Sequence, residues 1–265
     1  MNTAGKSEKT LISMPRSFND FFVKTAGLAV FAFRVVKEAF LPPYEISETL
    51  KQCYMIGYKS LPLISVTGFI IGLTLTLQSI PTLQKFGAES LVPSMVALAV
   101  MLEIGPVITA LIFAGKIGSG IGAELGSMRV TEQIDAMEVS GTNPFKYLAV
   151  TRVIAATLML PVLVILADAI ALFGGFLAVY LFGGLYFQSF IASSMAILGY
   201  KEVLPATFKT FLFGFGVGVV GCYEGFNASR GTESVGIAAN TAVVIASLLV
   251  ILIDMVMVQV ISILF

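Results

Sequence analysis

The sequence contains no histidine and no tryptophan, and only two of its 265 residues are cysteine. Histidine is the usual metal ligand and general base, so Ser/His catalysis and histidine-based zinc sites are excluded. Cys53 and Cys222 form neither a disulfide framework nor a metal-ligand spacing. Asp168 and Asp254 lack the Tyr-Asp and Gly-x-Gly-Asp contexts of intramembrane aspartyl proteases. We therefore expect no cofactor, no metal and no enzymatic activity in this chain.

Charge is also scarce. Only 12% of the residues are charged and 57% are hydrophobic, with a mean hydropathy of +0.94, whereas soluble domains carry about a quarter of charged residues. The formal net charge of zero argues against nucleic acid as a partner. The composition predicts an all-α integral membrane protein, because helices satisfy their own backbone hydrogen bonds in lipid.

Uncharged windows of about 20 residues predict five transmembrane helices. The 32-residue window at 169–200 exceeds one crossing, so we expect it to hold the end of the third span and an outer hairpin or short re-entrant segment around Gly183 and Gly184. The predicted spans lie at 60–84, 90–115 (interrupted by Glu103), from 153 into the 169–200 window, 203–223 and 234–253, the last followed by a tail to Phe265.

The first 45 residues differ from the transmembrane domain predicted for 46–265. Only nine uncharged residues separate Lys24 from Arg34, about 13 Å of helix and too short to cross a membrane. Phenylalanines alternate with basic residues there, which favours an interfacial amphipathic helix that ends at Pro42-Pro43. A cytosolic helix packed on a neighbouring element is the alternative.

Basic residues predict the orientation. They are concentrated before the first span and between the second and third spans, while the opposite loops carry only Lys85 and Lys201. By the positive-inside rule, the N-terminus is cytoplasmic and the C-terminus lies on the outer side.

A short amphipathic helix is predicted at about 130–140, in the charged stretch between spans two and three. Thr131 is its expected N-cap, and Ser140-Gly141 ends it. An apolar face and an acidic face recur at helical spacing, and we expect a soluble partner to dock on them, although a solvated loop helix without a partner is the alternative. These faces consist of Val130, Ile134 and Met137, and of Glu132, Asp135 and Glu138.

Glycines precede this helix. Gly118, Gly122 and Gly126 have small-xxx-small spacing, which lets helix backbones approach closely. Ile117 follows Lys116 where a phosphate-binding P-loop requires Ser or Thr, so this chain does not bind ATP by that motif.

Four ionisable residues lie within predicted spans: Glu103, Asp168, Lys209 and Asp254. Each costs roughly 2.5–3.5 kcal/mol at the middle of a bilayer on insertion scales, so such charges indicate function or pairing. Lys209 is expected to pair with Asp254 or with Glu103. The pair either locks helices together or forms a polar spot in an apolar cavity.

Two sequence blocks resemble the MlaE (YrbE) family, the permease subunits of ABC transporters that act with MCE proteins in lipid trafficking. The resemblance covers about Ile46 to the C-terminus, although Lys116, Thr151 and Ile237 depart from the residues usual in the family. The blocks comprise Glu103–Pro106, Ala114–Lys116, Ala123–Val130, Glu132–Ala136 and Asn143–Leu148, and then Gly221–Tyr223, Gly225, Gly231, Val235-Gly236 and Ala242–Val244.

The resemblance implies a multi-pass protein of the bacterial inner membrane, a homodimer that moves phospholipid. The helix at 130–140 would be the coupling helix that fits a separate cytoplasmic ATPase. A periplasmic MCE protein would bind outside, and a STAS-type accessory subunit occurs in some such systems. The candidate lipid cavity would combine the polar residues Glu103, Lys209 and Asp254 with aliphatic walls that include Leu73 and Leu77.

An ion-coupled secondary transporter is the alternative. Glu103, Asp168 and Asp254 would then bind protons or sodium ions. The absence of a visible inverted repeat and the presence of the predicted docking helix count against it.

Overall fold

The computed structural model describes residues 16–183, 186–229 and 231–264, and these residues are predominantly helical. The α-helices are α1 (Arg16–Ala39), α2 (Ile46–Gln84), α3 (Val92–Ala99), α4 (Gly105–Phe113), α5 (Ser119–Val130), α6 (Gln133–Val139), α7 (Thr151–Gly183), α8 (Phe187–Ile197), α9 (Tyr200–Phe226) and α10 (Thr232–Leu264). A 3₁₀ turn (Glu89–Leu91) precedes α3. Three π-helical turns, at Val100–Ile104, Ala114–Gly118 and Phe145–Val150, join α3 to α4, α4 to α5 and the loop after α6 to α7.

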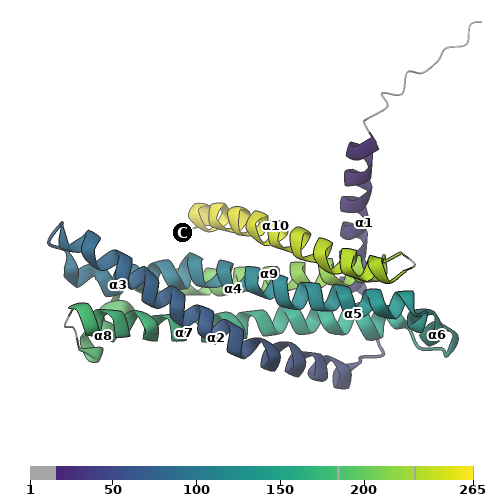
Figure 1. The fold of residues 1–265 in the computed structure, drawn as a ribbon, viewed down its shortest axis with the longest axis horizontal. Helices are drawn as coiled ribbons and strands as arrows, with labels where there is room; N and C mark the ends of the chain where they lie inside the picture. The colour runs from purple at the N-terminus through teal and green to yellow at the C-terminus, as the bar shows by residue number, and fades with distance from the viewer. Residues whose placement is uncertain (1–15, 184–185, 230, 265) are drawn as a thin grey trace, which may run out of the picture.

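Five helical stretches are long and apolar enough to cross a membrane, which confirms the predicted fold class. They are Ile46–Gln84, Glu89–Val130, Phe145–Phe182, Tyr200–Phe226 and Thr232–Ile263. In Figure 1 they lie side by side as an elongated bundle, with α6 and α1 at one end and α3 and α8 towards the other. The first stretch begins at Ile46 rather than near Ser60, because a charged N-terminal segment continues the apolar helix.

The second stretch is longer than predicted. It was expected to end near Gly115, but it continues as α5 to Val130. The glycines explain this: a Cβ at Gly122 would lie 3.2 Å from the Ala238 carbonyl oxygen of α10, and one at Gly225 of α9 would lie 3.1 Å from the Gly122 carbonyl oxygen. The expected close approach of backbones is therefore observed, and it keeps this segment within the bundle.

The long window at 169–200 contains a short helix. The third span ends at Gly183, and α8 then packs against α3 before α9 begins at Tyr200. Phe190 and Ser194 of α8 are buried, and Ser94 Oγ of α3 donates a hydrogen bond to the Ser193 carbonyl oxygen at 2.8 Å. The predicted outer segment is thus a helix anchored on α3, while Gly184 lies outside the described residues.

Helix α1 runs crosswise to the long helices at the end of the bundle where α6 lies (Figure 1). One face packs against the core through Leu28, Phe31 and Val35, and the Phe31 and Phe145 rings are 5.0 Å apart. Phe33 and Phe40 on the other side are 73% and 78% exposed. This arrangement suits a helix in the headgroup plane, as the sequence predicts.

Helices α2 and α7 pack most closely. A Cβ at Gly72 would come within 1.8 Å of the Ala171 carbonyl oxygen, and one at Gly68 within 2.9 Å of the Ala167 carbonyl oxygen. Only glycine allows this contact between the two backbones. The main buried cluster lies between α7, α9, α5 and the N-terminal half of α2.

Candidate functional site

An ion cluster joins three of the spans. Lys209 of α9 is 1% exposed, and its Nζ lies 2.7 Å from Glu103 Oε2 and 2.9 Å from Asp254 Oδ1 of α10. The sequence left open which carboxylate Lys209 pairs with, and the structure places both within hydrogen-bond distance. Two hydrogen-bonded carboxylates compensate the cost of burying one ammonium group.

Glu103 differs from its partners in exposure. Its side chain is 47% exposed in the single chain, against 20% for Asp254. It lies in the π-helical turn Val100–Ile104, 14 residues after the start of the second span at Glu89, and π turns often occur at functional positions. A half-exposed carboxylate at this depth requires water or another polar group rather than lipid tails.

The aliphatic residues predicted for the cavity walls lie on α2. Leu73 and Leu77 are both half-buried, and the main packing partner of α2 is α7. The ion cluster instead belongs to the second span, α9 and α10. A cavity lined by both the α2 leucines and the ion cluster would therefore have to extend between these helices. That the two groups line one cavity stays a prediction.

Asp168 of α7 lies apart from the ion cluster. It is 6% exposed, and its Oδ1 has no hydrogen-bond partner within the described part of the chain. It lines a cavity of about 350 Å³ together with Pro106, Met195 and Thr207. This oxygen therefore forms no hydrogen bond between helices within the described residues.

The predicted coupling helix is shorter than expected. Val130 ends α5, and Glu132 adopts a left-handed backbone with φ of 58°, so α6 includes only Gln133–Val139. The prediction of Thr131 as N-cap is wrong: its hydroxyl donates to the Ser127 carbonyl oxygen at 2.8 Å and closes α5. Helix α6 ends before Ser140, as predicted, and Gly141 has φ of 83°.

The two faces of this segment have different environments. Ile134 is 4% exposed and Met137 packs beside it against the core, so the apolar face anchors the segment to this chain. Glu132, Asp135 and Glu138 are exposed. Glu132 and Asp135 border a polar hollow of about 300 Å³ that also contacts the loop after α9. Arg129 borders the same hollow, and its Nη1 lies 2.5 Å from Asp135 Oδ1. The exposed surface of this segment therefore combines one ion pair with the carboxylates of Glu132 and Glu138, and its acids outnumber its basic residue.

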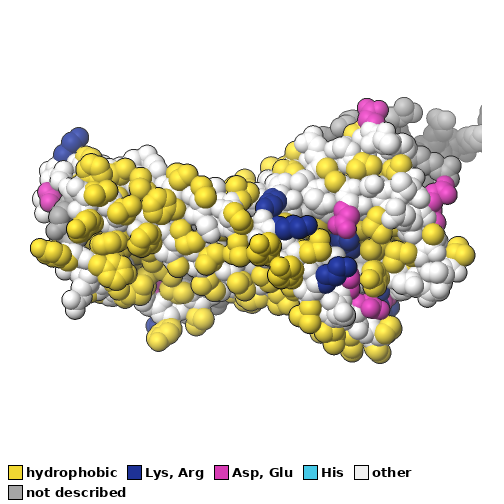
Figure 2. Space-filling model, turned by 60° about the horizontal axis from the view of Figure 1, so that its bottom comes forward, with side chains coloured by type: hydrophobic (Ala, Val, Ile, Leu, Met, Phe, Trp, Pro, Cys, Tyr) yellow, Lys and Arg dark blue, Asp and Glu magenta, His cyan; other side chains and the backbone are white. Residues whose placement is uncertain are grey.

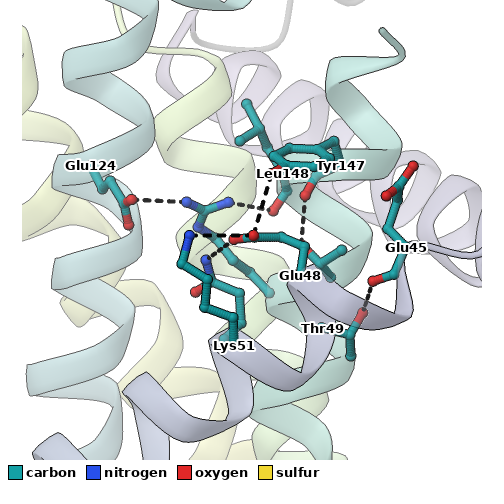
Figure 3. Close-up of polar contacts among 10 residues, drawn as sticks. Glu45, Glu48, Thr49, Lys51, Glu124, Tyr147 and Leu148 are labelled. Atoms are coloured by element: carbon teal, nitrogen blue, oxygen red, sulfur yellow. Dashed lines mark hydrogen bonds and ion pairs between the residues drawn. The ribbon is translucent and has the colours of Figure 1, made fainter.

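A polar network connects the flanks of α6 to α2 (Figure 3). Glu48 of α2 accepts hydrogen bonds from Gln52 Nε2 at 2.8 Å and from Tyr147 OH at 3.3 Å. Arg152 of α7 donates to Glu124 Oε1 of α5 at 2.9 Å and to the Leu148 carbonyl oxygen at 3.0 Å. Displacement of α6 would act on both α5 and α7, which this network joins.

Sequence reasoning missed the partners in this network. Glu124 and Arg152 are 28 positions apart, and Glu48 and Tyr147 are 99 apart, so helical spacing does not relate them. The available signal was the position of Arg152, directly before the predicted third span and seven residues inside the observed one, which begins at Phe145. Figure 2 shows the same distribution on the surface: charged side chains gather toward one end, and the rest of the face is mainly hydrophobic.

Comparison with known proteins agrees with this architecture. The family model described as "Permease MlaE" matches residues 49–260. A probable ABC transporter permease protein of Rickettsia typhi is 36% identical over 87% of this chain and 90% of its own length.

The intermembrane phospholipid transport system permease protein MlaE of Haemophilus influenzae is 32% identical, over 90% of this chain and 92% of that protein. The chloroplastic protein TRIGALACTOSYLDIACYLGLYCEROL 1 of Arabidopsis thaliana is 30% identical, over 92% of this chain and 70% of that protein. With a matching family model over most of its length and five spans in the expected places, this multi-pass membrane protein belongs to the MlaE permease family.

Proposed function

We propose that this chain is the permease subunit of an ABC transporter that moves phospholipid between the bacterial inner membrane and a periplasmic MCE protein. ATP hydrolysis takes place on a separate cytoplasmic subunit. The names of the relatives from Rickettsia typhi and Haemophilus influenzae support the transporter class and the lipid substrate. The structural observation that carries the proposal is the ion cluster of Glu103, Lys209 and Asp254.

The working unit is a homodimer in this proposal. Only 17% of the apolar window of α10 and 28% of that of α2 are buried within the chain, against 56% for the third span. Glu103 is half exposed within its span. A second copy would enclose this carboxylate in a shared cavity, where the cluster would meet a lipid headgroup and aliphatic side chains would contact the acyl chains.

The ATPase docks on the acidic side of α6, at the cytoplasmic end of the bundle. The N-terminus lies on the same side and the C-terminus on the periplasmic side. Nucleotide-driven closure of two ATPase copies would displace α6, and the Glu124–Arg152 pair transmits this to α5 and α7. A STAS-type subunit would bind, if the system has one, on this cytoplasmic assembly.

A pull-down of the tagged chain from native membranes tests this proposal. Mass spectrometry should recover a P-loop ATPase, an MCE protein and phospholipid. The double variant Asp135→Lys and Glu138→Lys should recover at least tenfold less ATPase in the pull-down, because it reverses the charge of the docking surface.

Glu89→Lys with Glu202→Lys is the matched control. Both residues are exposed acids, and they lie beside α3 and at the start of α9, away from α6 (Figure 1). This control should keep the ATPase. If both double variants keep it, α6 is not the docking surface; if the unaltered chain brings down no ATPase at all, the proposed function fails.

An ion-coupled transporter remains the second candidate because of Asp168. Its buried Oδ1 has no hydrogen-bond partner among the described residues, and Asp168 lines a cavity, as a proton or cation site would require. This candidate predicts transport by the purified chain alone under an ion gradient. It also predicts that Asp168→Asn abolishes that transport. If transport requires ATP and the D168N variant transports normally, the ion-coupled candidate is eliminated.

A further inference from the structure

Two adjoining cavities form one groove along α2 and α7. The first, of about 310 Å³, lies where α1, the elbow after it, α2 and the start of α7 meet. The second, of about 590 Å³, continues between α2 and α7. Cys53 lines both cavities, and Leu158 of the first is followed on α7 by Met159 and Val162 of the second. We call these two cavities together the α2–α7 groove.

Polar groups occur at only one end of this groove. The first cavity is bordered by the carboxylates Glu38 and Glu45 and by Lys146, together with Thr49 and Thr151. Beyond Tyr58 the lining is entirely apolar, from Leu61 on α2 to Ala169 on α7. A ligand that fits must therefore have a polar head and a long apolar tail.

The charges at the polar end match a zwitterionic head. Lys146 is 7% exposed; its Nζ donates to the Leu41 carbonyl oxygen and lies 3.9 Å from Glu38 Oε2. An ammonium group has three donors, so it can also bind a phosphate oxygen. The carboxylates of Glu38 and Glu45 on the same rim can accept the amine of the head.

The depth and length of the groove match one leaflet. Its polar end adjoins α1, the crosswise helix whose exposed phenylalanines suit the headgroup plane. Tyr54 and Tyr58 stack beside it with ring centroids 5.4 Å apart and are exposed, as is typical of the membrane interface. On α2 the lining extends from Ile46 to Leu61, about 22 Å of helix, and on α7 from Thr151 to Ala169, about 27 Å. Half of a bilayer with its headgroups measures about 20–22 Å.

We propose that the α2–α7 groove binds one phospholipid of the cytoplasmic leaflet, with its head at Lys146 and an acyl chain between α2 and α7. This site is separate from the cluster around Lys209, and the proposal extends the proposed function by adding a second lipid site on the membrane-facing side. The binding itself does not depend on ATP-driven transport.

Photo-crosslinking tests the proposal on the full complex in nanodiscs of phosphatidylethanolamine and phosphatidylglycerol, without nucleotide. The probe is phosphatidylethanolamine with a diazirine in one acyl chain, and labelled peptides are mapped by mass spectrometry. We expect the label to concentrate on α2 and α7 around Tyr58 and Val162. A diacylglycerol probe with the same chains, which lacks phosphate and amine, should label this region at least threefold less.

Val162→Trp should fill the apolar end and reduce this labelling at least fivefold. Leu204→Trp is its matched control, since Val162 and Leu204 are 55% and 65% exposed, and Leu204 lies on α9, which the homodimer proposal does not place against a second copy. Leu158→Trp, at the junction of the two cavities, is a second blocking variant if V162W gives too little protein. L204W should leave the labelling of the groove unchanged.

Three results would overturn the proposal. The first is equal labelling around Leu204 of α9 and of the groove, which means annular lipid alone. The second is unchanged labelling in V162W and L158W. The third is a groove that is not labelled by the lipid probe, together with crosslinking of two chains through Cys53 by a short bis-maleimide. This result would mean that a second copy of the chain fills the groove. ATP-driven lipid transfer is measured in parallel. Transfer without labelling of the groove would contradict only this proposal, and labelling without transfer would contradict only the proposed function.

Discussion

At the scale of single residues, the most consequential feature is the balance of charge around Lys209. One buried ammonium group faces two carboxylates, so the cluster carries a net negative charge and its most exposed member is Glu103. Such a cluster holds α9, α10 and the second span in register. It also leaves a carboxylate available to a ligand in the cavity that we propose.

Replacing Lys209 with Met should destabilise the protein by about 3 kcal/mol, the lower end of the range for a broken buried pair, because Glu103 is half exposed. Neutralising all three residues (K209M with Glu103→Gln and Asp254→Asn) should restore most of the thermal midpoint measured in detergent. Lipid transfer should stay impaired in the neutral triple variant. Full transfer there would mean that the cluster only locks helices together.

Arg152 and Glu124 form an unequal pair. The Arg152 side chain is 4% exposed and its Nε has no hydrogen-bond partner in the described structure, whereas Glu124 is 50% exposed. Removal of the carboxylate therefore leaves a buried cation with one partner fewer. Removal of the cation leaves only a carboxylate that water can reach.

We therefore expect Glu124→Ala to lower the thermal midpoint more than Arg152→Met, although Glu124 is the more exposed residue. Methionine approximates the length and packing of the arginine stem. Differential scanning fluorimetry of the purified variants would measure this. An equal or opposite order would show that the guanidinium is hydrated or finds another acceptor.

At the scale of the elements, the α2–α7 contact depends on glycine. Gly72 lies against the backbone of Ala171, whereas Gly115 has no atom within 4 Å of a built Cβ. Glycine is about 1 kcal/mol less favourable than alanine within a helix. Its presence at Gly72 is explained by packing, and at Gly115 the local structure provides no such reason.

Gly72→Ala should accordingly destabilise the protein, with a lower thermal midpoint and less folded protein in membranes. Gly115→Ala should be neutral or stabilising by up to about 1 kcal/mol. Fluorescence-detected size-exclusion after heating would compare the two. Similar midpoints for G72A and the unaltered chain would mean that α2 and α7 separate in the functional assembly.

At the scale of the whole molecule, polarity differs between the two ends of the bundle. The end with α1 and α6 carries the polar network and most of the basic residues, and the other end carries few charges (Figure 2). By the positive-inside rule, we predict that the basic end lies in the cytoplasm, where the proposed ATPase would bind.

Cysteine labelling in intact cells tests this orientation of the chain in the membrane. Phe86→Cys and Val139→Cys introduce thiols at positions that are 80% and 90% exposed, at opposite ends of the bundle, in a Cys53→Ala background. Cys222 is buried and can stay. A membrane-impermeant maleimide should label position 86 from outside and position 139 only after lysis. The reverse pattern would invert the proposed topology.

Local composition was sufficient for much of the fold. Spans are runs of apolar residues, so their number and approximate positions could be predicted. The presence of a helix before Pro42-Pro43 and the end of α6 before Ser140 could also be predicted from local residues, whereas the crosswise course of α1 could not. Helix boundaries could not: α2 begins 14 residues early, at Ile46 rather than Ser60, and α5 continues through a glycine-rich stretch. In both places contacts with other helices outweigh the local signal.

The sequence by itself determined the membrane class, the family and the identity of the charged residues within the spans. Only the tertiary structure decided their partners: that Lys209 meets both Glu103 and Asp254, that Arg152 meets Glu124, and that Ile134 faces inward. The reason is physical. Hydropathy is a property of consecutive residues, whereas the partner of a charge depends on the rotation and register of helices that are far apart in the chain.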